Sequence, residues 1–209
     1  QEHQKQEHQK QEHQKQEHQK QEHPIPVHKV PEILTQVICA AALLCIGEII
    51  CAPFILAMAT NTGIALVPWI CIASMLAVFF CYTVGFALFW AIDYVSMQIK
   101  ESLRARLAPV IFGLGGFIAY ATWGYFVIPA IFDSLLAGID AEPLSVSQRL
   151  AVGFNCAVLG FVAWFVAKIV APRFSERLAP VVVTGVITLV LAALGVFYMV
   201  MIFTYIAHA

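Results

Sequence analysis

One ionisable residue stands deep inside an apolar run that is long enough to cross a membrane. Glu48 lies about 4 Å past the midpoint of the run at 33–58, at 1.5 Å of rise per helical residue. A carboxyl group at that depth needs hydrogen-bond partners, water or a bound proton. Pro53 follows it by five residues and denies the helix one backbone hydrogen bond close to the acid.

Three neutral polar residues are expected near the level of Glu48 when depth is counted along the other apolar runs: Ser74, Thr122 and Asn155. If these groups converge, they can hydrogen-bond a protonated Glu48 or pass a proton or small cation between oxygen ligands. The alternative is that Glu48 is an interhelical hydrogen-bond donor that holds the bundle together. Lys168 falls at the end of its run, so we expect its ammonium group to reach the interface rather than to pair with Glu48.

The sequence lacks the residue patterns that disulfide, metal, haem or enzyme chemistry would require. The six cysteines all lie in apolar runs and form no CxxC pair, which argues against disulfides and metal binding. His208 is the only histidine after residue 28, which excludes a buried bis-histidine haem. HExxH, GxSxG and Walker motifs are absent, and the loops between runs are too short for a catalytic domain. We therefore predict a non-enzymatic protein with no cofactor and no metal site.

Composition places the chain in a membrane. The 209 residues are 60% hydrophobic and 12% charged, with a mean hydropathy of +0.79, whereas about 25% of residues are charged in ordinary soluble domains. Residues 1–32 hold eleven of the 25 charged groups, which leaves fourteen for the rest of the chain. The net charge of −1 provides no basic surface for phosphates, so nucleic-acid binding is excluded.

The chain divides into a polar extension, a connector and an apolar body. Residues 1–23 repeat Gln-Glu-His-Gln-Lys, which favours a helix, but the five-residue period turns each copy by about 140° and forms no apolar stripe. The histidine spacing fits metal binding poorly, so the tail is predicted to be a helical extension that contacts a protein partner. Residues 24–32 form a proline-rich connector, and the transmembrane domain is predicted over 33–209.

The body is predicted to be an all-α bundle of about five transmembrane helices. Each run has at least 24 residues, enough to cross about 30 Å of hydrocarbon. The uncharged turn at 59–63 is the weakest boundary, so four spans with a re-entrant start remain the alternative. The predicted spans are about 33–58, 64–92, 108–132, 147–171 and 178–207.

Basic residues predict the orientation of the spans. In a five-span topology, eleven of the twelve Lys and Arg residues fall on one side and only Arg149 falls on the other. Basic loops face the cytoplasm, so the N-terminus is predicted inside and the C-terminus outside. A bacterial inner membrane is the expected location.

Small residues predict where helices approach one another closely, namely at Gly113, Gly116, Gly185 and Gly195. Short loops and a helix-rich body favour a subunit or scaffold of a membrane assembly, formed with copies of itself or with other membrane subunits, with lipids as its other partners. The alternative function is a small ion or proton channel or transporter that uses Glu48.

Overall fold

Every regular secondary-structure element of the described chain is a helix in the computed structural model, which describes residues 31–58, 66–99, 101–137 and 142–208. No strand occurs within those ranges. The tail predicted at 1–23 and nearly all of the connector predicted at 24–32 lie outside the described residues. The elements are α2 (Glu32–Met58), α3 (Leu66–Phe80), η1 (Cys81–Gly85), α4 (Phe86–Met97), α5 (Glu101–Ala137), α6 (Val146–Phe174) and α7 (Leu178–His208).

Five helical segments in the described ranges are long and apolar enough to cross a membrane, as the sequence predicts. The second of them is α3, η1 and α4 together, from Leu66 to Met97. Its helix continues beyond the predicted end at residue 92, so Asp93 lies within α4 rather than in a loop. Helix α5 likewise extends beyond the predicted run at both ends.

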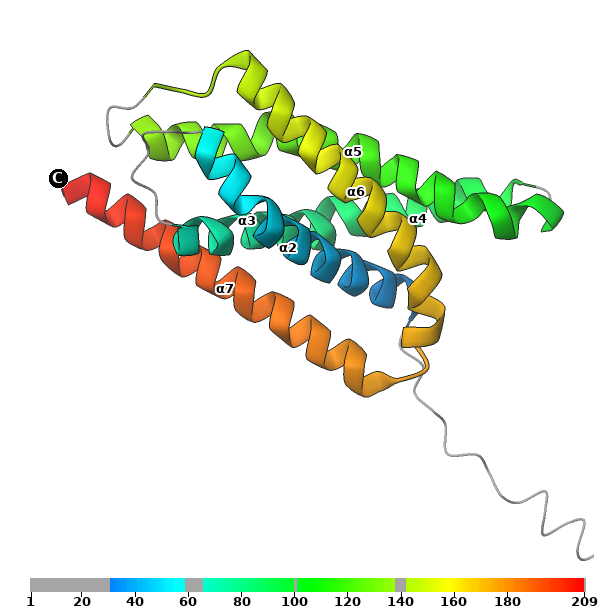
Figure 1. Ribbon diagram of the computed structural model, residues 1–209. Helices are drawn as coiled ribbons and strands as arrows, with labels where there is room; N and C mark the ends of the chain where they lie inside the picture. Colours follow the sequence, from blue (N-terminus) through cyan, green and yellow to red (C-terminus); the bar gives the residue numbers. More distant parts are fainter. Residues whose placement is uncertain (1–30, 59–65, 100, 138–141, 209) are drawn as a thin grey trace, which may run out of the picture.

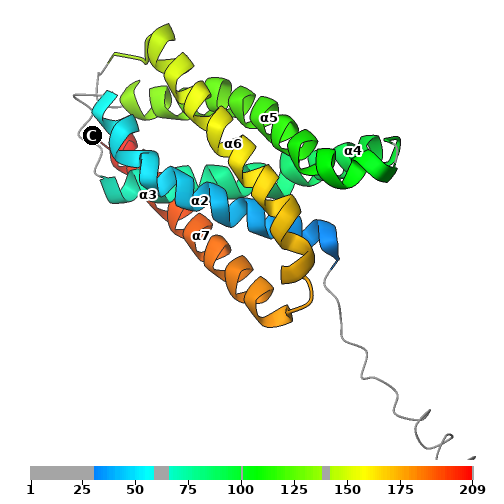
Figure 2. The ribbon, with the colours of Figure 1, turned by 45° about the vertical axis from the view of Figure 1, so that its right-hand side comes forward.

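Helix α2 is the centre of the bundle. It packs against α6 on one side and against α3 and α7 on the other, as Figures 1 and 2 show. Helix α5 covers α6, and α7 covers α3, whereas the consecutive helices α6 and α7 scarcely touch. A residue on the inner face of α2 is therefore enclosed by neighbours on several sides.

The helix ends separate the basic side chains into two groups. The start of α2, the junction between α4 and α5, and the turn between α6 and α7 all lie at one end of the bundle (Figure 1). Arg104 and Arg106 lie near the start of α5, and Arg173 and Arg177 lie at the turn between α6 and α7, so all four belong to that end. Arg149 lies near the start of α6, at the other end. The arrangement keeps the charge asymmetry of the sequence; which end faces the cytoplasm stays a prediction.

A five-residue π-helical turn interrupts the second span. In η1, the Thr83 hydroxyl donates to the carbonyl oxygen of Phe79 over 2.6 Å. Gly85 ends this turn beside the Trp164 ring, which a Cβ atom at Gly85 would meet at 3.1 Å. Wide turns of this kind locally change the direction of side chains along a helix. Here, the turn follows Phe80 and precedes Phe89, both fully buried.

Glycines allow the closest helix contacts. A Cβ atom on Gly116 of α5 would collide with the backbone of Gly160 and with Trp164 on α6. A Cβ atom on Gly195 of α7 would likewise collide with Cys71 and Met75 of α3. Gly113 lies against Phe161 and Gly185 lies against Ile38, with more room at Gly185.

Replacing Gly116 by valine is expected to destabilise the bundle. The added side chain has no space between α5 and α6, and overpacking of this kind costs about 2 kcal/mol. The matched control is Ala130→Val, at an exposed position of the same helix. In mild detergent, the midpoint of thermal unfolding should fall clearly for Gly116→Val and change little for Ala130→Val. Equal midpoints would contradict the close contact.

Candidate functional site

Glu48 forms the centre of the candidate site. Its side chain is 0% exposed, and the Tyr120 hydroxyl of α5 donates to its Oε1 atom over 2.7 Å. The second carboxyl oxygen, Oε2, has no hydrogen-bond partner within the described residues. One oxygen is therefore satisfied by a donor, while the other is left to carry a hydrogen or to meet a group outside the described chain.

Helical periodicity places Glu48 inside. The buried positions of α2 include Ala41, Cys45, Glu48, Ala52 and Ile55, spaced by three or four residues. That spacing defines one face of an α-helix, and the intervening Ile46 and Ile50 are exposed. The position of the acid thus follows from the pattern of its own helix.

Cysteine thiols lie near the carboxyl group. The Cys156 thiol of α6 lies 4.0 Å from Oε1 of Glu48. One turn earlier on α2, the Cys45 thiol donates to the carbonyl oxygen of Ser74 over 3.8 Å. No three His, Cys, Asp or Glu side chains within the described ranges converge in a way that could hold a metal ion.

The basic side chains that make ion pairs in the described ranges do so away from Glu48. Lys168 pairs with Asp93 and Glu32, and Arg149 pairs with Asp133. A carboxylate at Glu48 would therefore be buried without a counter-ion among the described residues, at a cost of several kcal/mol. The environment favours the neutral acid, in which Oε1 accepts from Tyr120 and Oε2 bears the hydrogen.

Buried aromatic rings lie on both sides of the site along the bundle. Toward the end where α2 begins, Phe80 contacts both Tyr120 and Trp164, with ring centroids 5.0 and 5.6 Å apart, and Trp164 stacks on Phe89 at 5.2 Å. Toward the opposite end, Trp69 and Phe132 form an edge-to-face pair at 4.8 Å. These rings are buried, and Glu48 itself is 0% exposed within the described chain.

The other residues predicted at this level have different positions. Ser74 is buried and its hydroxyl has no partner in the described chain, while its carbonyl accepts from Cys45. Asn155 of α6 is half-buried beside Cys51, and Cys51 lies one turn from Glu48 along α2. Thr122 is exposed, and its hydroxyl donates to Ile118 of its own helix over 2.8 Å. The structure therefore brings Ser74 and Asn155 close to the residues that flank Glu48, but not Thr122.

Tyr120 and Cys156 were not predicted as partners of Glu48. Tyr120 is only two residues from Thr122, so counting depth along the run also predicts that Tyr120 lies near the level of Glu48. Its orientation differs by roughly 200° around α5, because each helical residue turns by about 100°. A tyrosine buried in a membrane helix needs a hydrogen-bond partner for its hydroxyl, and this requirement is the feature of the sequence that could have indicated Tyr120 as the partner of Glu48.

Lys168 has a larger structural role than the sequence suggests. Its Nζ atom lies 3.3 Å from Asp93 of α4, 3.6 Å from Glu32 of α2 and 4.5 Å from the centre of the Phe112 ring of α5. The side chain thus connects α6 to three neighbouring helices. At the other end of α6, Arg149 pairs with Asp133 of α5, whose carboxylate also accepts from the backbone of Leu144.

No protein family, no curated protein and no solved structure matches the chain. The class defined by the described residues is an all-helical bundle with five helices long and apolar enough to cross a membrane. Its most unusual feature is a carboxyl group buried between α2, α5 and α6. Inferences about function therefore start from that group.

Removing the Tyr120 hydroxyl is expected to weaken the contact between α2 and α5. Tyr120→Phe leaves Oε1 of Glu48 without its donor, and hydrogen bonds between membrane helices contribute about 1 kcal/mol. Tyr125→Phe, at a half-buried position of the same helix, is the matched control. Reversible unfolding in mixed micelles should show a lower free energy of unfolding for Tyr120→Phe and no change for Tyr125→Phe. Indistinguishable free energies of unfolding would contradict the assignment.

Proposed function

We propose that this chain is a non-enzymatic integral membrane protein that takes up and releases a proton at Glu48 within its helical bundle. The observation that supports this proposal is the buried carboxyl group with one oxygen bound to Tyr120 and the other unpartnered in the described chain. A purely structural acid would be expected to use its hydrogen in a second hydrogen bond. An ionisable group held at such depth is more readily explained by a function than by stability.

Proton release from Glu48 must be accompanied by a structural change. In the neutral form, Tyr120 donates to Oε1 and the hydrogen resides on Oε2. Loss of that hydrogen creates a carboxylate whose donors in the described chain are the Tyr120 hydroxyl and the weak thiol of Cys156. Water or a cation must then reach the site, because an uncompensated carboxylate is too costly in a dry interior.

The buried aromatic rings on either side of Glu48 would have to move apart for water to reach its carboxyl group. Phe80 contacts both Tyr120 and Trp164 and directly precedes the π-helical turn at Cys81–Gly85. A π-helical turn can be converted to an α-helical one with a local change in side-chain direction. Such a conversion would displace Phe80 from its place between the proton-binding group and the Lys168 end of the bundle.

The proposed location is the bacterial inner membrane, with the N-terminus in the cytoplasm and the C-terminus outside. The clustering of basic residues at the end where α2 begins supports this orientation. In this orientation Lys168, Asp93 and Glu32 lie toward the cytoplasm, and Arg149 and Asp133 lie toward the exterior.

Glu48→Gln is expected to abolish proton flux in proteoliposomes that contain a pH-sensitive dye and a potassium diffusion potential. Glutamine keeps the shape and accepts from Tyr120, but it cannot release a proton at this depth. Glu176→Gln, the same substitution at an exposed position, is the control and should retain wild-type flux. Equal, nonzero flux in Glu48→Gln would contradict the proposal, as would the absence of flux through the wild type.

A second candidate function is that of a subunit in a membrane assembly, and α7 is the observation that favours it. Only 11% of the most apolar stretch of α7 is buried in the bundle, against 56% for the first and second spans. Large apolar side chains are exposed along the helix, from Val182 to Tyr205. An additional helix from a second copy or another subunit would find an uncovered apolar surface there.

Light scattering after extraction in mild detergent tests this second candidate. The assembly function predicts a protein mass of at least two copies of the 23.0 kDa chain, or one copy together with another protein. Disulfide cross-linking in native membranes, with single cysteines placed at exposed positions of α7, should trap the same contact. A lone chain in both measurements would contradict it.

A further inference from the structure

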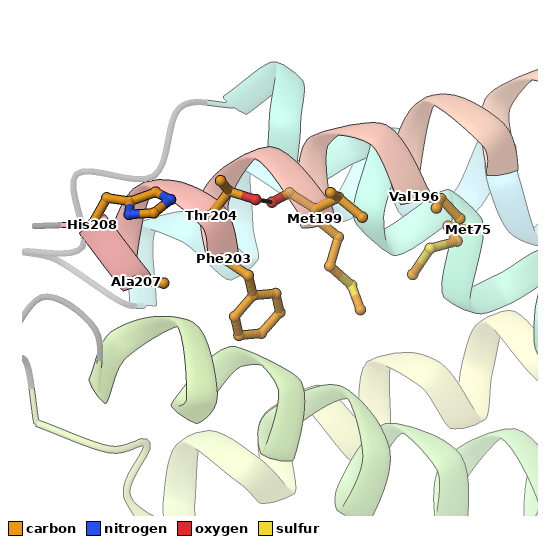
Figure 3. Close-up of a pocket in the computed structure, with 8 residues that line it drawn as sticks. Met75, Val196, Met199, Phe203, Thr204, Ala207 and His208 are labelled. Carbon is orange, nitrogen blue, oxygen red and sulfur yellow. Dashed lines mark hydrogen bonds between the residues drawn. The ribbon is translucent and has the colours of Figure 1, made fainter.

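A groove runs along the last part of α7, where this helix adjoins α3. Its volume is about 500 Å³. Figure 3 shows Met75, Met199 and Phe203 projecting on the same side, with Met75 contributed by α3 and the other labelled residues by α7. The lining residues are Met75, Val196, Met199, Val200, Phe203, Thr204, Ala207 and His208.

The groove begins next to a close helix crossing. At Gly195, the backbone of α7 meets Cys71 and Met75 of α3 so closely that no Cβ atom fits. The lining starts at the next residue, Val196, and continues to the end of the helix. The crossing therefore adjoins the inner end of the groove, and the α7 residues that line the groove lie on its C-terminal side.

Polarity changes along the groove in one direction. Its inner end is formed by valine and methionine side chains, whereas Thr204 and His208 lie toward the end of α7. The Thr204 hydroxyl already donates to the carbonyl oxygen of Val200, which leaves the His208 imidazole as the principal polar group at the mouth. Tyr205 is exposed in the same turn, a residue type that membrane proteins favour at the level of lipid headgroups.

The length of the groove matches one leaflet of a bilayer. From Val196 to His208 the helix rises about 18 Å, and half of a hydrocarbon core of roughly 30 Å is about 15 Å. An amphiphile with its polar group at His208 would thus have its tail end near the middle of the membrane. Met75 and Met199 suit a tail of variable shape, because methionine is unbranched and adapts to its contacts.

We propose that this groove binds one acyl chain of a membrane phospholipid, whose phosphate accepts a hydrogen bond from the His208 imidazole. Its volume lies within the range of small-molecule sites, and its apolar lining with a single polar end complements a lipid rather than a water-soluble ligand. This site is separate from Glu48, and the proposal does not depend on the proton-handling function.

The test uses wild-type protein in phosphatidylcholine nanodiscs that contain phosphatidylglycerol with a photoreactive diazirine in its acyl chain. Val200→Trp fills the groove with an indole ring. Val190→Trp is the matched control, because Val190 lies outside the lining and is 53% exposed, close to the 59% of Val200. After illumination, cross-linked peptides are quantified by mass spectrometry and normalised to total labelling of the chain.

We expect the wild type and Val190→Trp to be labelled preferentially over residues 196–208. In Val200→Trp, the labelling of these residues should be roughly tenfold lower than in the wild type. Both variants should elute as the wild type does in size-exclusion chromatography, which separates loss of the lipid from loss of the fold. Uniform labelling along the exposed faces of α7 would overturn the proposal. Equal labelling of residues 196–208 in Val200→Trp and Val190→Trp would also overturn it.

Discussion

The hydrogen bond from Tyr120 to Glu48 is the interaction on which the candidate site depends, because Glu48 is fully buried in the bundle. It joins the central helix α2 to α5, and Cys156 brings α6 to the same carboxyl group. Taking an acid out of water is costly, so the helices that enclose it must supply a donor and exclude uncompensated charge. The closely packed contact of α5 and α6 at Gly116 and Gly160 holds two of these helices together.

Charge is confined to the ends of the bundle, and aromatic rings separate those ends from the centre. The Lys168 cluster with Asp93 and Glu32 lies at one end, and the pair formed by Arg149 and Asp133 lies at the other. This order follows from solvation, since ions keep contact with water or headgroups while rings fill the dry layers between. Glu48 is the acid of the described chain that lies at the centre instead, in surroundings that favour its neutral form.

The sequence predicts the fold more completely than the site. Five apolar runs of sufficient length indicate five spans, and the depth of Glu48 follows from its place in the first. Depth alone does not determine the direction of a side chain, however. Thr122 and Tyr120 occupy nearly the same level of α5, yet only Tyr120 faces the acid. The π-helical turn and the contacts of Lys168 depend on packing between helices distant in the chain, which residue spacing does not encode.

The central claim is that Glu48 is a neutral acid hydrogen-bonded to Tyr120 in the folded protein. Infrared difference spectroscopy in lipid bilayers, comparing the wild type with Glu48→Gln, tests it most directly. A neutral Glu48 should give the carbonyl stretching band of a protonated carboxyl group, which is lost in Glu48→Gln and shifts to higher frequency in Tyr120→Phe. A pair of carboxylate bands assigned to Glu48, with no protonated carbonyl band, would contradict it.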